Sequence, residues 1–192
     1  MQHSVNSERM TLYADANSGY SVEEAVRIGK MLEEYNYSIY EEPVRFDAYE
    51  ETKQVADALQ IPLGGGEQEP SMMNFRWMIK NSALQVLQPD QFYFGMIQSV
   101  KVARMAHAAG KLCAPHMSGT GLGYLYMMHF VSILPNTTPY NQFKGFNEDL
   151  PMECPTSDLT IDENGALKVP SGPGLGVIID PDFIKKHEEI KI

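Results

Sequence analysis

The chain has 192 residues and a formal net charge of −10, and 43% of its residues are apolar and 10% aromatic. This composition is typical of a folded globular protein and excludes disordered and collagen-like chains. The acidic balance also argues against nucleic acid or an anionic membrane as a partner, because either surface needs a basic face.

Short β-prone runs alternate with stretches of helical periodicity from residue 11 onward. The predicted strands span residues 11–14, 37–40, 61–63, 84–87 and 111–114. The predicted helices span about residues 21–32, 47–59, 73–79, 97–109 and 121–134. The first helix has a capping-box start, because Ser21 is followed three residues later by Glu24. This alternation predicts an α/β fold in which crossover helices cover a parallel sheet.

Ionisable side chains follow the predicted strands at regular distances along the chain. They are Asp15, Glu41, Glu67, Asp90 and His116. Steps of 26, 26, 23 and 26 residues separate them, and one more step of 26 reaches Gln142. A strand-helix unit of roughly 25 residues is the module of a (β/α) barrel, whose chemistry lies at the carboxyl ends of its strands. We therefore expect these side chains to converge on one mouth of a barrel.

Three carboxylates come from successive strand ends, at Asp15, Glu41 and Glu67. Without a counter-ion they would repel one another, and three hard oxygen ligands with room left for water and substrate suit Mg²⁺. Other acidic residues lie beside or outside the register, and we expect them to be solvated loop acids. They are Glu42, Glu50, Glu51, Glu69, Glu188 and Glu189.

Asp90 and His116 follow the next two strands, so we expect them to lie within hydrogen-bond reach of each other. A carboxylate that holds an imidazole in one tautomer and raises its basicity makes a general acid or base near neutral pH. Two interpretations of Asn17 stay open. It hydrogen-bonds the substrate, or it is a turn residue beside Gly19.

The ordered set of motifs resembles the barrel domain of the enolase superfamily, in its mandelate racemase/muconate lactonizing enzyme branch. The motifs are Asp15-Ala16-Asn17, Glu41-Glu42-Pro43, Gly66-Glu67, Pro89-Asp90 and Pro115-His116. The late segment 173–177 and Asp180-Pro181 are similar to the C-terminal tail of that branch. The resemblance covers nearly the whole chain from residue 11 onward.

The resemblance implies a Mg²⁺ site made by Asp15, Glu41 and Glu67, with His116 as base and Asp90 as its partner. It implies a lyase or isomerase that abstracts the proton α to a carboxylate and forms an enediolate, as in acid-sugar dehydratases. Asn17 and Gln142 would then bind the substrate. The branch often carries a Glu where this chain has Gln142, which donates a neutral hydrogen bond and cannot act as an acid.

Compared with that branch, the resemblance begins at the third barrel strand, so we expect about six of eight strand-helix units. The fold would be a partial (β/α) TIM-type barrel at residues 11–150, after an irregular leader at 1–10. A tail at 151–192 would return toward the missing capping domain. The branch's Lys-X-Lys motif would lie upstream of Met1. The alternative is therefore a truncated, catalytically silent member, or half of a split protein that keeps the metal ligands.

The remaining expectations concern the cellular setting. The longest mostly apolar stretch, 121–134, is too short to span a bilayer, and the polar first residues do not resemble a secretory leader. Cys113 and Cys154 are too few and too far apart for a disulfide framework or a zinc site. We expect a cytoplasmic enzyme of acid-sugar catabolism that acts on a small carboxylate and contacts no nucleic acid or membrane. Its full-length form would be a homo-oligomer.

Overall fold

A computed structural model of the chain describes residues 10–117, 122–142, 161–178 and 181–185. In these ranges five parallel strands form one sheet in the order β1-β2-β3-β4-β5. The strands are β1 Tyr13–Asp15, β2 Ile39–Glu41, β3 Leu63–Gly65, β4 Val86–Leu87 and β5 Leu112–Cys113. Each strand pairs with the next along the chain, as in the wall of a (β/α) barrel. The predicted α/β class with a parallel sheet is confirmed.

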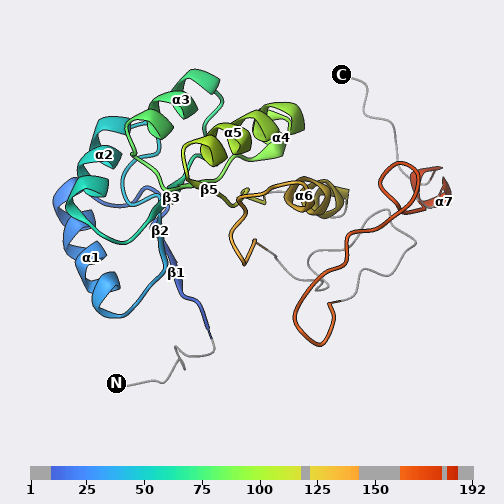
Figure 1. Cartoon of the computed structure of the whole chain (residues 1–192), viewed down its shortest axis with the longest axis horizontal. Coiled ribbons are helices and arrows are strands. Elements are labelled where there is room, and N and C mark those ends of the chain that lie inside the picture. The colour runs from blue at the N-terminus through green and yellow to red at the C-terminus, as the bar shows by residue number, and fades with distance from the viewer. Residues whose placement is uncertain (1–9, 118–121, 143–160, 179–180, 186–192) are drawn as a thin grey trace. The chain divides into compact units, whose positions relative to one another are not determined.

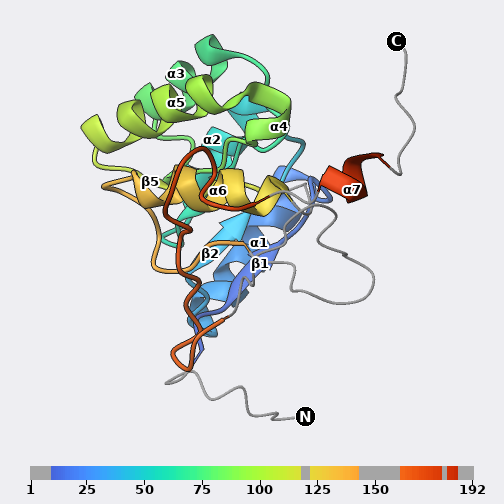
Figure 2. The ribbon, with the colours of Figure 1, turned by 90° about the vertical axis from the view of Figure 1, so that its right-hand side faces the viewer.

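Helices follow the strands in the predicted order. They are α1 Val22–Glu34, α2 Tyr49–Ala58, α3 Met72–Lys80, α4 Gln91–Phe94, α5 Met96–Ala108, α6 Leu122–Ser132 and α7 Pro181–Lys185. The helices α1, α2, α3 and α5 follow one another along one side of the sheet (Figure 1). Both views place α3 and α5 side by side (Figure 2). The layer is therefore the crossover layer that a parallel sheet needs.

Local signals explain where the helices begin. The Ser21 hydroxyl accepts from the backbone N–H of Glu24, and the Glu24 carboxylate accepts from the backbone N–H of Ser21, which is the predicted capping box. Neither α7 nor the short helix α4 was predicted. Helix α4 forms because the Asp90 side chain caps its first turn, and Gly95, with φ of +85°, separates it from α5.

The core lies between the sheet and the helical layer. Its buried side chains include Tyr40 on β2, Leu63 on β3, Val55 on α2, Phe75 on α3 and Val102 on α5. Because strands and helices contribute together, burial of these apolar groups fixes the sheet against its helices. The carboxyl ends of the strands are thereby held at one edge.

The sixth strand-helix unit is reduced in the described residues to a single bridge. Thr137 forms an isolated parallel bridge with Cys113, where a sixth strand would continue the sheet beyond β5. Asn136 holds this segment, because its Nδ2 donates to the carbonyl oxygens of Ala103 and Lys111 at 3.2 and 2.9 Å. Five strands and this bridge are consistent with the predicted partial TIM-type barrel.

The chain divides into two compact units, Met1–His116 with Pro135–Asn141, and Met117–Leu134 with Gln142–Ile192. The first unit holds the sheet and α1 to α5. In the second unit, Tyr124 and Met127 of α6 pack with Met117. None of the helices in the described ranges combines the length and the apolar character that a membrane crossing needs. The domain limits predicted at residues 10 and 150 stay predictions.

Candidate active site

The five side chains of the predicted register lie at or just beyond the carboxyl ends of the five strands. Asp15 and Glu41 are the last residues of β1 and β2 and are register partners in the sheet. Glu67, Asp90 and His116 follow the ends of β3, β4 and β5. Parallel pairing places all five strand ends at the same edge of the sheet, which is where (β/α) barrels carry their chemistry.

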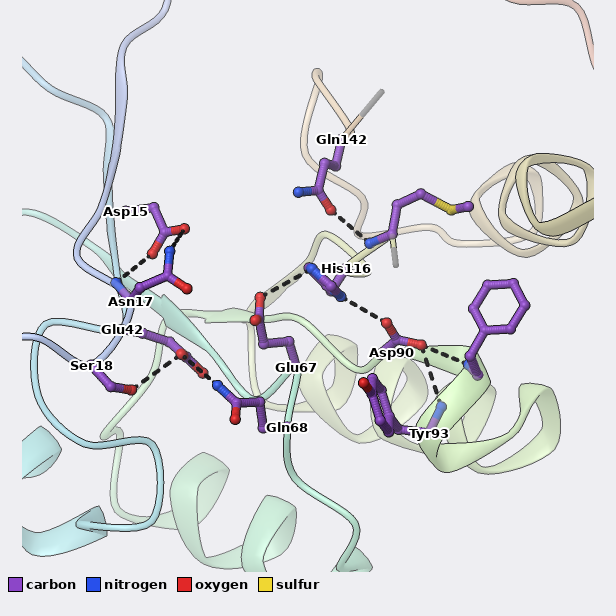
Figure 3. A network of polar contacts seen from close by, with 12 residues as sticks. Asp15, Asn17, Ser18, Glu42, Glu67, Gln68, Asp90, Tyr93, His116 and Gln142 are labelled. Atoms are coloured by element: carbon purple, nitrogen blue, oxygen red, sulfur yellow. Dashed lines mark hydrogen bonds and ion pairs between the residues drawn. The ribbon is translucent and has the colours of Figure 1, made fainter. Parts of the chain in front are cut away.

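Asp90 and His116 form the hydrogen bond that the register predicts. His116 Nδ1 lies 2.7 Å from Asp90 Oδ2 (Figure 3). Asp90 is fully buried, and its Oδ1 accepts from the backbone N–H groups of Phe92 and Tyr93 at 2.6 and 3.4 Å. An ionised carboxylate only accepts hydrogen bonds, so opposite it Nδ1 of His116 is the donor, and in the neutral imidazole Nε2 then carries the lone pair.

The other ring nitrogen of His116 faces Glu67. His116 Nε2 lies 3.4 Å from Glu67 Oε2 (Figure 3). Burial alone would lower the pKa of His116, but the Asp90 hydrogen bond and the charges of Glu67, Asp90 and Glu41 together raise it. Burial raises the pKa of Glu67 to about 7, with His116 opposing the shift and the carboxylates of Glu42, Glu41 and Asp15 adding to it. The His116 imidazole is therefore surrounded by carboxyl groups, which favour its positively charged form.

Asp15 and Glu41 complete the acidic edge. Asp15 accepts from the backbone N–H of Asn17 at 2.8 Å and from Asn17 Nδ2 at 2.6 Å. Asn17 thus forms a tight turn, with φ of +44°, and its amide is directed to Asp15 (Figure 3). Burial raises the pKa of Glu41, against a hydrogen bond from the Gln88 side chain, and the nearby charge of Asp15 raises it further.

The predicted metal ligands are close enough to influence one another but do not form a cage. No group of three or more His, Cys, Asp or Glu side chains among the described residues lies as a metal ion would require. Asp15 is bonded to Asn17 and Glu67 faces His116. The donor set nevertheless fits Mg²⁺, because the charge of Asp15 raises the pKa of Glu41, and the charges of Asp15 and Glu41 raise the pKa of Glu67, where no cation balances them.

Gln142 belongs to the second compact unit. Its Oε1 accepts from the backbone N–H of Met117 at 2.6 Å (Figure 3). With Oε1 in this contact, the Nε2 group is the donor that Gln142 can offer to other partners. Its predicted role in substrate binding stays a prediction.

Two acids that we expected to be solvated are buried. Glu42 is 5% exposed and Glu69 is 3% exposed. Glu69 accepts from the Tyr49 hydroxyl, from Asn74 Nδ2 at 3.1 Å and from the backbone N–H of Ser71 at 2.7 Å. The expectation was wrong because a polar residue outside a register can still be enclosed by neighbouring loops. The sequence around Glu42 and Glu69 carries no local signal that marks either acid as buried.

The other acids outside the register divide in two groups. Glu50 and Glu51 are exposed in the first turn of α2, as expected. Glu188 and Glu189 lie outside the described residues.

Comparisons with known proteins place this chain beside metabolic enzymes. Residues 1–183 match the family model described as enolase C-terminal domain-like. Arabinonate dehydratase of Saccharolobus solfataricus is 30% identical, over 96% of this chain and 49% of its own. D-galactarolactone cycloisomerase of Agrobacterium fabrum is 30% identical, over 91% of this chain and 48% of its own. The chain spans about half the length of the curated relatives it matches.

A solved structure gives the same result for the fold. The crystal structure of a member of the enolase superfamily from Salmonella Typhimurium matches with a TM-score of 0.82. It is 29% identical, over 92% of this chain and 45% of that chain. The five strands and their helices therefore have the arrangement found in a solved member of the enolase superfamily.

Proposed function

This chain belongs to the enolase C-terminal domain-like family, and on that basis we propose that its site abstracts the proton α to a carboxylate. The relatives that it matches include acid-sugar dehydratases and a cycloisomerase, and all of these are enzymes. Among their reactions we propose dehydration of an acid sugar. The observation that carries this proposal is the hydrogen bond between buried Asp90 and His116 at the strand ends.

His116 is the proposed base. Nδ1 of the neutral imidazole keeps its proton and donates a hydrogen bond to Asp90, so the lone pair on Nε2 can accept the α-proton of the substrate. The electron pair of the broken C–H bond then delocalises into the substrate carboxylate, which gives an enediolate. The positive imidazolium that results is stabilised by the Asp90 carboxylate, which lies 2.7 Å away. Asp90 therefore orients the base and supports its charge.

The same imidazole completes the elimination. The Nε2 proton of His116 passes to the β-hydroxyl, the C–O bond breaks and water leaves, while the enediolate electrons form the carbon–carbon double bond. The enol product tautomerises to a 2-oxo acid. One histidine thus serves as base and then as acid, whereas racemisation requires bases on two faces of the substrate.

Three carboxylates are the proposed ligands of a divalent cation. Asp15, Glu41 and Glu67 would hold Mg²⁺ at the strand ends. When bound, the ion supplies positive charge beside the substrate carboxylate, which acidifies the α-proton. Asn17 and Gln142 are the proposed substrate-binding residues. Asn17 also holds Asp15 in its present orientation.

The protein that contains this chain would act on a small carboxylate in the cytoplasm, as a homo-oligomer. The acidic net charge of −10 supports the proposal that nucleic acid and anionic membranes are not its partners. The names of the relatives support the choice of an acid sugar as substrate.

Replacement of the base tests the proposal. The purified protein is incubated with Mg²⁺ and a panel of aldonates that includes arabinonate, and the 2-oxo acid is measured as its semicarbazone. The change His116→Asn should lower kcat by about 10²–10⁴-fold, whereas His107→Asn on the exposed side of α5 should not. Retained turnover in His116→Asn contradicts the assignment. Mg²⁺ binding without turnover in the unmodified protein favours the catalytically silent alternative.

A further inference from the structure

A buried carboxylate that the proposed chemistry does not use lies among the three loops that carry the proposed metal ligands. Glu42 follows Glu41 at the end of β2 and is 5% exposed. Its Oε2 accepts a hydrogen bond from Ser18 Oγ and another from Gln68 Nε2, each at 3.3 Å. Figure 3 shows the Glu42 side chain between these two donors. One oxygen atom therefore bridges the loops that follow β1 and β3.

Each donor is close in sequence to a proposed ligand. Ser18 lies three residues after Asp15, and Gln68 directly follows Glu67. Glu42 itself directly follows Glu41. The bonds to Glu42 therefore join the three ligand-bearing loops at points next to their ligands.

Backbone contacts attach the same loops to one another. The backbone N–H of Ser18 donates to the Glu42 carbonyl at 2.8 Å, and the backbone N–H of Glu42 donates to the Gly64 carbonyl at 3.1 Å. The Ser18 hydroxyl also accepts from the backbone N–H of Phe46 at 3.1 Å. Ser18 and Glu42 are thus two of the residues through which the loops after β1 and β2 contact each other.

The backbone at this junction is strained. Asn17, Ser18 and Glu42 have φ values of +44°, +61° and +38°. For residues with a Cβ this region costs about 1 kcal/mol or more each, so it persists only where surrounding contacts hold it. Because the Glu42 side chain supplies such contacts, its loss should release the loops.

We propose that Glu42 is a positioning residue that ties the loops after β1 and β3 to its own loop, so that Asp15, Glu41 and Glu67 can face one Mg²⁺ ion. This inference rests on the proposed function. Glu42 acts through its neighbours and is not itself a ligand. Its Oε1 has no hydrogen-bond partner among the described residues, and the side chain lines a small pocket with Thr52 and Leu84.

The structure supplies a conservative variant and a matched control. In Glu42→Gln the amide oxygen can take the place of Oε2 and accept both bonds, while Glu42→Ala removes the bridge. The control is Glu69→Ala, because Glu69 is equally buried but bonds to Tyr49, Asn74 and the backbone of Ser71. Removal of the Glu69 side chain should disturb the contacts of the loop after β3 with α2 and α3, and should leave the hydrogen bonds of Glu42 in place.

Amide hydrogen exchange of the full chain without metal tests the tie itself. In Glu42→Ala, the amides of Ser18 and Gly19 should exchange at least about tenfold faster than in the unmodified chain. Glu42→Gln should stay within about threefold, and Glu69→Ala should leave both amides unchanged. Should Glu42→Ala fail to fold, Ser18→Ala removes one arm of the bridge and should give a smaller increase at Gly19. Unchanged exchange in the variants that fold overturns the inference.

Calorimetric titration with Mg²⁺ tests the consequence for the ligands. Glu42→Ala should bind Mg²⁺ about tenfold more weakly, while Glu42→Gln and Glu69→Ala should stay within about threefold. Equal affinity in Glu42→Ala overturns the inference and leaves the proposed function standing. If the unmodified chain binds no Mg²⁺, the proposed metal site is wrong, and hydrogen exchange still decides whether Glu42 ties the loops.

Discussion

At the scale of single residues, Glu67 has neighbours with opposing effects. His116 lowers its pKa, whereas the charges of Asp15, Glu41 and Glu42 raise it. Burial raises its pKa to about 7, so the folded chain holds the proton more tightly than the unfolded chain, where the value is 4.5. Without metal, the contribution of Glu67 to stability therefore falls as the pH rises from about 4.5 to 7.

The change Glu67→Gln should separate stability from metal binding. In EDTA at pH 8 it should raise the free energy of unfolding by about 1–2 kcal/mol, because it removes a buried charge among like charges. The gain should shrink toward pH 5, where the folded wild-type carboxyl is already protonated. Urea unfolding at both pH values measures this difference. A loss of stability at pH 8 would show that the carboxylate is favourably paired in the metal-free chain.

Cys113 is a second residue whose surroundings set its chemistry. It is fully buried on β5, and burial raises the pKa of its thiol to about 12. In a Cys154→Ser background, alkylation by iodoacetamide at pH 8 should be at least about 100-fold slower in the folded chain than in urea. The reason is that the thiolate is scarce and the reagent is excluded. Similar rates in both states would contradict the burial of Cys113.

At the scale of elements, the turn between β3 and the Glu67 loop depends on a glycine. Gly66 has φ of +102°, and a Cβ there would lie 2.8 Å from the ring of Phe75 on α3. Gly110 offers a comparison, because it ends α5 with φ of +68° and a Cβ there would meet nothing within 4 Å. At both positions the positive φ disfavours any residue with a Cβ atom. Only at Gly66 would the Cβ also clash with a core side chain.

Alanine at these two glycines should therefore have unequal costs. Gly66→Ala should lower the free energy of unfolding by about 2–4 kcal/mol, since strain and overpacking add. Gly110→Ala should cost about 1–2 kcal/mol from strain alone. Urea denaturation of both variants measures the difference. Equal costs would mean that the Phe75 ring yields freely and that the strand-to-loop turn is not fixed by α3.

At the scale of the whole molecule, the proposed metal site couples folding to Mg²⁺. A ligand that binds only the native chain stabilises it by about 2.7 kcal/mol at a hundred times its Kd. For a chain of 192 residues this corresponds to a rise in Tm of about 5–10 °C. Thermal unfolding with Mg²⁺ or EDTA measures the shift, and Glu67→Gln should abolish it. No shift in the unmodified chain would contradict the proposed site.

Much of the site could be predicted from spacing along the chain. Each strand-helix unit uses a nearly constant number of residues, so the ionisable residue after one strand recurs after the next, and parallel pairing puts them at one edge. This is why Asp90 and His116 were expected to meet, and they do. Individual strand limits differ by up to two residues from the predicted ones, since β-propensity marks the apolar part of a strand and not its last paired residue.

Partners and burial could not be predicted in the same way. Glu42 and Glu69 are polar residues in loops, and nothing in their own sequence says that three neighbouring loops enclose one of them and two helices the other. The direction of the Asn17 amide toward Asp15 also depends on a local turn with positive φ.

The sequence by itself determined the order of the units, the parallel sheet and the edge on which the chemistry-bearing residues lie, because these follow from periodicity and spacing. Only the tertiary structure decided which of those side chains touch. Hydrogen bonds and desolvation depend on distances of a few ångströms between residues far apart in the chain, such as Ser18, Glu42 and Gln68. The packing of the loops sets these distances, and the spacing of residues along the sequence does not determine that packing.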